Sequence, residues 1–176
     1  PVISRSKCEA ANMNEGAMQE RIVLCRTPDE IQALLERFHM VLPSLKRGKA
    51  FRAAMAEKFF QHGKVVFIPE DGRAVGFAAF YCNDHVERKG YLSMIAVYPD
   101  MQGKGCGKEL LTYVEHTAKD CGMRTVWLEV SKANGSARSF YRKNGYVPVE
   151  MRPESMICAK KLENASDEWT EDTHDV

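Results

Sequence analysis

At residues 102–107 the chain reads Gln102, Gly103, Lys104, Gly105, Cys106 and Gly107. An apolar, strand-like segment (Tyr91 to Tyr98) precedes this run, and an amphipathic segment with helical spacing (Lys108 to Cys121) follows it. A strand that turns through glycines into a helix is a common phosphate-binding arrangement. The sequence therefore predicts an anion site at this turn.

The predicted helix supplies the attraction for an anion. Its first backbone N–H groups lack intrahelical acceptors, and the helix dipole adds partial positive charge at the same end. Glycines at 103, 105 and 107 would let a diphosphate approach the main chain and would permit positive φ values, while Lys104 and Lys108 add charge. The alternative is a plain strand-to-helix connection, because glycine-rich turns serve that purpose too.

The spacing of the glycines excludes two common nucleotide-binding loops. Glycines at every second residue do not form the GxGxxG pattern of dinucleotide-binding proteins. The Walker pattern is absent as well, because Lys108 is not followed by Ser or Thr and position 102 is not glycine. The pattern that does fit is Gln-x-x-Gly-x-Gly.

A second block downstream consists of Asn134, Ala137, Phe140, Tyr141, Lys143, Gly145 and Tyr146. Together the two blocks resemble the GNAT family of acyl-CoA-dependent N-acetyltransferases. The first block matches the family's pyrophosphate-binding signature at every fixed position, and the second resembles its Asn-x-x-Ala-x-x-x-Tyr helix. The resemblance covers roughly residues 21–161, and two motifs in the right order make it more specific than either alone.

Length and composition indicate a single domain, which we place at residues 21–162. A chain of 176 residues with 44% hydrophobic content can bury a core, and it is too short for two typical domains. No apolar stretch approaches the roughly 20 residues needed to cross a membrane, and the first residues lack an export signal. We expect a soluble, cytoplasmic protein that does not associate with membranes.

Both ends of the chain differ in composition from this domain. Residues 163–176 carry six acidic residues and no Lys or Arg, so the rest of the chain has a net charge of +7 although the whole has +1. We expect residues 1–20 and 163–176 to be disordered, and the initial Pro leaves open whether the first segment is native. The basic body suits an anionic cofactor, and without interleaved aromatic residues it does not indicate nucleic-acid binding.

The cysteines indicate neither a metal site nor disulfides. They are Cys8, Cys25, Cys82, Cys106, Cys121 and Cys158, and no two form a CxxC pair. Most lie in apolar contexts typical of reduced core residues. Cys106 lies beside the predicted helix start, where a thiolate would be favoured, and the alternative is a small residue tolerated in the turn. We expect no metal.

Hydrophobic periodicity and capping signals predict the remaining elements. Strands are predicted over 21–25, 64–68, 74–81, 91–97, 125–130, 147–149 and 156–159, and helices over 28–40, 49–61, 108–121 and 135–143. This order is mixed α/β, or α+β-like. The resemblance implies a GNAT fold, in which a central, mostly antiparallel sheet of six to seven strands splays between the fourth and fifth strands and is flanked by about four helices.

The resemblance also implies how acetyl-CoA binds as the co-substrate. In the family the pantetheine arm lies between the fourth and fifth strands, which assigns backbone contacts with this arm to Ile95 and Val97. The diphosphate is then assigned to Gln102, Gly103, Lys104, Gly105, Cys106, Gly107 and Lys108. Asn134 is a further candidate for the pantetheine arm, although a role as helix N-cap would explain it equally well.

Acetyl transfer requires a proton donor for the departing thiolate, and the resemblance assigns this role to Tyr141, near the cofactor sulfur. A phenol of normal pKa, about 10, matches a thiolate of similar basicity. The alternative is that Tyr141 and Phe140 are packing aromatics of an amphipathic helix.

Glu129 is the candidate general base that deprotonates the amine. It is the only acid in an apolar strand, 125–130, where burial would make it a stronger base. Some family members that acetylate protein N-termini carry a glutamate twelve residues before the tyrosine, as Glu129 precedes Tyr141. The alternative is a structural pair with Lys or Arg. Further candidates for binding substrate or relaying a proton are Asp84, His85, Glu87, Tyr91 and Ser93.

We therefore expect an N-acetyltransferase that moves an acetyl group from acetyl-CoA to a primary amine of a small molecule or peptide, by direct transfer in a ternary complex. Three alternatives stay open: a longer acyl-CoA donor, a catalytically silent CoA-binding regulatory domain, and a phosphate-binding module unrelated to CoA. The segments that select the acceptor in this family carry no readable signature here. We expect a monomer or homodimer.

Overall fold

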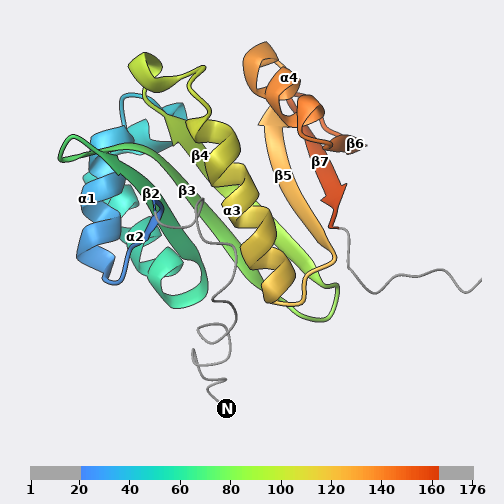
Figure 1. Cartoon of the computed structure of the whole chain (residues 1–176), viewed down its shortest axis with the longest axis horizontal. Coiled ribbons are helices and arrows are strands. Elements are labelled where there is room, and N and C mark those ends of the chain that lie inside the picture. The colour runs from blue at the N-terminus through green and yellow to red at the C-terminus, as the bar shows by residue number, and fades with distance from the viewer. Residues whose placement is uncertain (1–20, 163–176) are drawn as a thin grey trace, which may run out of the picture.

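The computed structural model describes residues 21–162 (Figure 1). Its strands are β1 (Val23–Leu24), β2 (Lys64–Glu70), β3 (Arg73–Asp84), β4 (Lys89–Val97), β5 (Thr125–Ser131), β6 (Val147–Met151) and β7 (Ser155–Lys161). Its helices are α1 (Pro28–Phe38), α2 (Lys49–His62), α3 (Cys106–Asp120) and α4 (Gly135–Lys143), with short 3-10 helices η2 (Pro43–Arg47) and η3 (Pro99–Met101). Of these described helices, none combines the length and apolar character needed to span a bilayer. The segments 1–20 and 163–176, which we expected to be disordered, lie outside the described residues.

The seven strands form one sheet in the order β1-β2-β3-β4-β5-β7-β6. Every neighbouring pair is antiparallel except β4 and β5, which run parallel. Parallel neighbours need a crossover connection, and α3 supplies it between β4 and β5. The predicted fold class is confirmed: a mixed, mostly antiparallel sheet with four α-helices.

The strands β4 and β5 separate part-way along their length. Their pairing ends where Leu92 lies opposite Leu128. A bulge lies at the next residue, because the register between β3 and β4 shifts there and leaves Ser93 without a partner. A bulge bends its strand, so β4 continues beside β3 while β5 continues beside β7, as Figure 1 shows. The predicted splay is confirmed, and we call the space between residues 93–97 and 129–131 the opening.

Helices cover one face of the sheet more completely than the other. On the first face, α3 lies across β3 and β4 (Figure 1), and α4 packs into the same hydrophobic cluster. On the second face, the cluster beneath α1 and α2 draws on β2, β3 and β4, and it includes no described residue of β5, β6 or β7. No helix of residues 21–162 therefore packs on the β5–β7 part of the second face.

Local sequence signals set the helix ends. Thr27 and Glu30 form the predicted capping box at the start of α1, with each side chain bonded to the backbone N–H of the other at 3.2 and 3.3 Å. Most predicted bounds differ from the observed ones by one to three residues, and two of these differences concern the start of the third helix and the length of the first strand. The third helix begins at Cys106 instead of position 108, because the left-handed Gly105 is its N-cap, and the first strand has only the two residues that pair with β2.

Candidate functional site

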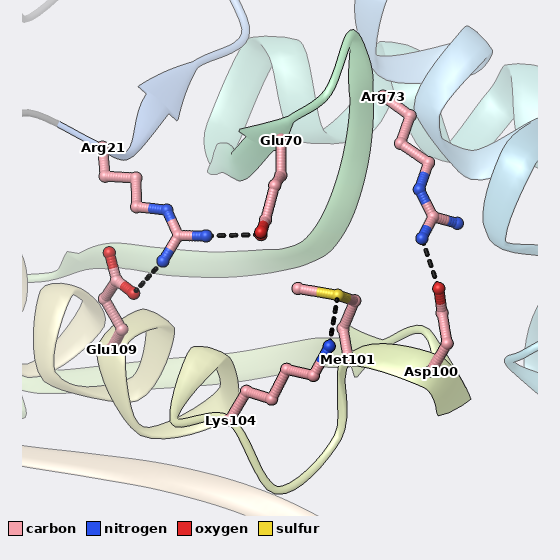
Figure 2. Close-up of polar contacts among 7 residues, drawn as sticks. All are labelled: Arg21, Glu70, Arg73, Asp100, Met101, Lys104 and Glu109. Carbon is pink, nitrogen blue, oxygen red and sulfur yellow. Dashed lines mark hydrogen bonds and ion pairs between the residues drawn. The ribbon is translucent and has the colours of Figure 1, made fainter.

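The loop that follows β4 is held against β3 (Figure 2). Arg73 of β3 forms an ion pair with Asp100 of η3, and Met101 is buried beneath the loop. These contacts of the middle and last residues of η3 anchor residues 102–105, the glycine loop, at the C-terminal end of β4. This end of β4 is also the one that borders the opening.

Two of the three glycines adopt a backbone conformation that other residues avoid. Gly103 has φ 78° and Gly105 has φ 91°, and a Cβ at either position would meet nothing within 4 Å. Conformation, not space, therefore requires glycine at both. Gly107 was expected to share this role and does not, because it lies inside α3, where a Cβ would contact the ring of Phe140 at 3.5 Å. Gly107 instead marks the point where α3 meets α4.

The start of α3 presents backbone N–H groups without acceptors. The N–H of Glu109 makes the first intrahelical bond, to the C=O of Gly105 at 3.0 Å. The amides of Cys106, Gly107 and Lys108 therefore have no acceptor within the helix, and the N-cap glycine offers no side chain to satisfy them. Together with the helix dipole, these three donors form an anion site.

Side-chain charges around this helix start favour an anion. Lys104 Nζ lies 3.6 Å from the sulfur of Met101 and pairs with no carboxylate among residues 21–162 (Figure 2). The acid in the first turn of α3, Glu109, turns toward Arg21, whose Nη1 lies 3.7 Å from its Oε2. Arg21 also binds Glu70 at 2.5 Å. The positive charge of Lys104 is thus available to an anion, whereas Arg21 offsets the negative charge of Glu109.

The side chain of Cys106 belongs to the core. It is 2% exposed in the cluster beneath α3, and the five cysteines among residues 21–162 are all buried. A thiol without solvent access is not positioned to react, so the interpretation of Cys106 as a functional thiol is wrong. Its backbone amide, at the start of α3, is the part of Cys106 that could contact an anion. Residues 21–162 contain no group of three or more His, Cys, Asp or Glu arranged to hold a metal ion.

The backbone of β4 presents two further donors to the opening. Successive N–H groups of a strand point to opposite sides, and the N–H of Tyr98 bonds back to the C=O of Val75 on β3 at 3.0 Å. The N–H groups of Val97 and Ile95, at the alternate positions, therefore face the opening. The C=O of Val97 points the same way and accepts a hydrogen bond from Gln102 Nε2 at 3.1 Å. The predicted donors form a row that leads to the glycine loop.

Tyr141 projects from α4 into the core on the α3 side of the sheet. Its side chain is 8% exposed, and its ring centroid lies 5.3 Å from that of Phe140 and 5.7 Å from that of Tyr146. Burial, aided by the nearby thiol of Cys158, raises the pKa of Tyr141 well above the usual value for a phenol. The expected normal pKa is therefore wrong. The phenol keeps its proton throughout the neutral range, which suits both a packing role and a role as proton donor.

Glu129 lies on the opposite face of the sheet. Its neighbours Leu128 and Val130 pack into the cluster beneath α3 and α4, so the Glu129 side chain points to the face without a helix. The expected burial is wrong, because this side chain is 38% exposed. Its carboxylate accepts a hydrogen bond from Ser155 Oγ at 2.5 Å and pairs with Arg152 Nη1 at 3.2 Å. The structural pair that the sequence left as an alternative is present.

Arg152 and Ser155 are the residues that sequence analysis missed. Arg152 lies in the turn between β6 and β7, and Ser155 is the first residue of β7. The N–H of Arg152 donates to the C=O of Ser155 at 3.0 Å. They reach Glu129 because β7 pairs with β5, and no local signal in the sequence announces this pairing. Tyr91 lies close enough for its pKa to be raised, first by its own burial and then by the charge of Glu129.

Four other candidate residues lie at the start of α4 or at the turn between β3 and β4. Asn134 is the N-cap of α4, and its Oδ1 accepts a hydrogen bond from the N–H of Ala137 at 3.0 Å. Asp84, His85 and Glu87 lie at the turn between β3 and β4. This turn is at the far end of β4 from the glycine loop, roughly 25 Å away at the usual rise of a strand. These three residues therefore lie outside the site.

Comparison with known proteins explains this arrangement. The sequence profile of the acetyltransferase (GNAT) family matches residues 29–146, which include the glycine loop, β5 and α4. The chain belongs to this family. The expected family is thereby confirmed, and the opening between β4 and β5 is the splay expected of a GNAT fold.

Two curated GNAT relatives match part of the chain. A ribosomal protein bS18 alanine N-acetyltransferase of Haemophilus influenzae is 39% identical over 83 residues, which are 47% of this chain and 54% of that protein. A mycothiol acetyltransferase of Thermomonospora curvata is 30% identical over 95 residues, which are 54% of this chain and 31% of that protein. The chain thus spans about half, or less, of the length of these relatives.

A solved GNAT structure extends the likeness to nearly the whole fold. The PaiA N-acetyltransferase from Thermoplasma acidophilum, in complex with coenzyme A, has a TM-score of 0.64 and 19% identity. The match covers 80% of this chain and 98% of that one. At this identity the likeness supports the fold alone.

Proposed function

We propose that the protein transfers the acetyl group of acetyl-CoA to a primary amine of a small molecule or peptide, by direct attack in a ternary complex. The observation that carries the proposal is an uninterrupted series of groups along one edge of β4. The series begins with unsatisfied amides at the start of α3 and continues with the donors of Val97 and Ile95. It ends between Tyr141 on one face of the sheet and Glu129 on the other.

The start of α3 is the proposed site for the cofactor diphosphate. The amides of Cys106, Gly107 and Lys108 would bind its oxygens, and Lys104 would lie beside them. The pantetheine arm would then accept hydrogen bonds from the N–H groups of Val97 and Ile95. This path leads from the glycine loop toward the bulge at which β4 and β5 part.

Tyr141 is the proposed proton donor. The ring of Tyr141 lies next to Cys158 of β7. Cys158 pairs with Leu128, which is the last residue of β5 that pairs with β4. The phenol therefore lies beside the narrow end of the opening, where the thioester would lie. As the amine nitrogen attacks the carbonyl carbon, the C–S bond breaks and the departing thiolate takes the phenolic proton, which solvent then replaces.

Glu129 is the proposed base for the acceptor. The amine would approach from the helix-free face and give one proton to the carboxylate, directly or through a water molecule, as the new C–N bond forms. Arg152, in the β6–β7 turn, and Ser155, at the start of β7, contact this carboxylate and would hold its orientation. The cofactor and the acceptor would thus approach the reacting carbon from opposite faces of the sheet.

Two measurements on the full chain test this function. The first is CoA binding by calorimetry, and the second is release of free thiol from acetyl-CoA with a panel of polyamines, aminoglycosides, amino sugars, amino acids and peptides. Binding together with thiol release is the expected result. Binding without release from any acceptor would favour the silent CoA-binding domain, and release only from a longer acyl-CoA would change the donor. Absence of CoA binding would overturn the proposal.

A peptide N-terminus is the acceptor to test first. One relative is named for acetylating an alanine of a ribosomal protein, and the Glu129 face has no helix over it to exclude a chain. Peptides that begin with alanine should therefore release thiol, whereas the same peptides with a blocked N-terminus should not. The other relative is named for mycothiol. Turnover with small-molecule amines but with no peptide would therefore indicate a small-molecule acceptor.

A further inference from the structure

A second pocket, of about 480 Å³, lies between α4 and the strands β6 and β7. Arg138 and Arg142 of α4 line one side, Pro148 and Met151 of β6 line the other, and Tyr141 contributes to its wall. This volume lies within the usual range for small-molecule sites, about 300–1,000 Å³. Of its lining residues, the proposed reaction uses only Tyr141.

The pocket and the glycine loop lie on different sides of α4. Lining positions 135, 138, 139 and 142 recur at helical spacing and form one face of the helix. Phe140 projects from another face and meets the position of Gly107 at the start of α3. A ligand in the pocket would therefore leave the proposed cofactor path free.

Two arginines give the pocket a positive charge that no acid offsets. Arg138 Nη1 donates to the C=O of Lys132 at 3.1 Å, which fixes the guanidinium and leaves its other donors free. None of the ion pairs among residues 21–162 includes Arg138 or Arg142, and α4 contains no acidic residue. Burial raises the pKa of the Cys158 thiol and the charge of Arg138 opposes that rise, so this charge acts at the pocket wall.

The rest of the lining is largely apolar. Met156 and Cys158 are buried in the floor, and Met151 lies at the rim with 63% of its surface exposed. Guanidinium groups bind carboxylates through paired hydrogen bonds, and an apolar floor favours a hydrocarbon body. We propose that this pocket binds a small carboxylate with an apolar chain, at a site separate from that of acetyl-CoA.

An NMR titration of the full chain tests this proposal, with hexanoate as the probe. Backbone amide signals of residues 135–142 and 147–158 should shift and saturate, both without CoA and with saturating CoA. Hexanamide, which lacks the charge, and acetate, which lacks the chain, should each bind about tenfold more weakly or worse. Arg142→Gln should weaken hexanoate binding about tenfold, whereas Lys143→Gln, a charge loss at a neighbouring residue outside the pocket, should not.

Three results would overturn the proposal. Shifts confined to residues 95–108, or abolished by CoA, would show hexanoate in the cofactor path instead. Equal affinity for hexanoate and hexanamide would remove the role of the arginines, and so would equal affinity of the Arg142→Gln and Lys143→Gln variants. Because the titration measures binding and not turnover, its outcome does not depend on the proposed acetyl transfer.

Discussion

At the level of single residues, the burial of Tyr141 decides what its hydroxyl can do. A phenol packed between Phe140, Tyr146 and Cys158 loses the solvation that would stabilise a phenolate. It therefore stays protonated at neutral pH and gives up its proton only to a strong base. In the proposed reaction the departing CoA thiolate would take this proton only if the opening desolvates the thiolate as well and so raises its basicity.

We expect Tyr141→Phe to lower kcat by about 100-fold, because general acid catalysis contributes at least that much. The affinity for CoA should stay unchanged, since the ring and its packing remain. Tyr113→Phe, which removes a half-buried hydroxyl from α3, is the matched control and should keep normal turnover. Steady-state kinetics with acetyl-CoA would measure both variants, and equal kcat for the two would remove the acid role from Tyr141.

Glu129→Gln should lower kcat by about 100-fold with little effect on CoA binding, because the amide accepts no proton from the amine. Glu150→Gln is the control, since Glu150 also binds Arg152, at 2.9 Å, but lies on the edge strand β6. Glu129→Gln should lower kcat, whereas Glu150→Gln should keep the kcat of the parent protein. If both variants lose the same activity, the carboxylates act only by holding Arg152, and the base lies elsewhere.

At the level of elements, the junction of β4 and α3 carries the proposed cofactor site. The strand edge supplies donors in a row, the glycine loop turns the chain, and the helix start ends the row with three unsatisfied amides. Each contribution comes from the backbone. Side chains act here chiefly by leaving space and by keeping negative charge away, as the Arg21 contact with Glu109 does.

Gly105→Ala should separate the backbone role of the loop from its effect on stability. The left-handed φ of 91° makes alanine unfavourable by about 1 kcal/mol, and any relaxation turns the amides away from the diphosphate. We expect CoA affinity to fall about tenfold. Gly122→Ala, with φ 79° at the other end of α3, should lose similar stability and bind CoA normally. Calorimetry and thermal unfolding would measure both, and equal CoA affinities would contradict the loop assignment.

At the level of the whole molecule, the uneven cover of the sheet gives the opening two distinct sides. Helices α3 and α4 enclose the side on which Tyr141 lies. Helices α1 and α2 stop at β4 on the other side, so Glu129 remains open to an acceptor. The separation of the two faces would let the protein bind both substrates at once.

The core as a whole should make the protein sensitive to alkali. Burial raises the pKa of Cys25 to about 12, with a smaller effect of Glu30, and burial also raises the pKa of Tyr141 and Tyr146 above the normal value. Unfolded thiols and phenols lose protons above about pH 8.5 and 10, whereas the folded chain retains them. The contribution of these three groups to the free energy of unfolding should therefore be constant below about pH 8 and fall as the pH rises toward 12.

Urea unfolding between pH 7 and 11 would measure this decline. Cys25→Ala should lower the stability at neutral pH, because packing is lost, but should make the pH dependence less steep. The same slope in the variant and the parent protein would show that Cys25 does not contribute to the decline.

Much of this structure is encoded locally, and could therefore be predicted. The capping box at Thr27, the glycines at 103 and 105 and the apolar period of α3 each act over a few residues, so they indicate the element order and the anion site. The predicted burial of Glu129 failed for the opposite reason. A strand that is apolar on one face is buried on the other only if another element packs against it, and the cluster beneath α1 and α2 does not extend to Glu129.

The amino acids alone therefore specify the elements, the family and the backbone donors, because these depend on neighbours in the chain. Tertiary structure decides the rest. Pairing of β7 with β5 brings Arg152 and Ser155 to Glu129, the bulge at Ser93 creates the opening, and the limited reach of α1 and α2 leaves one face exposed. Each of these outcomes depends on contacts between segments far apart in sequence, for which no local pattern carries the information.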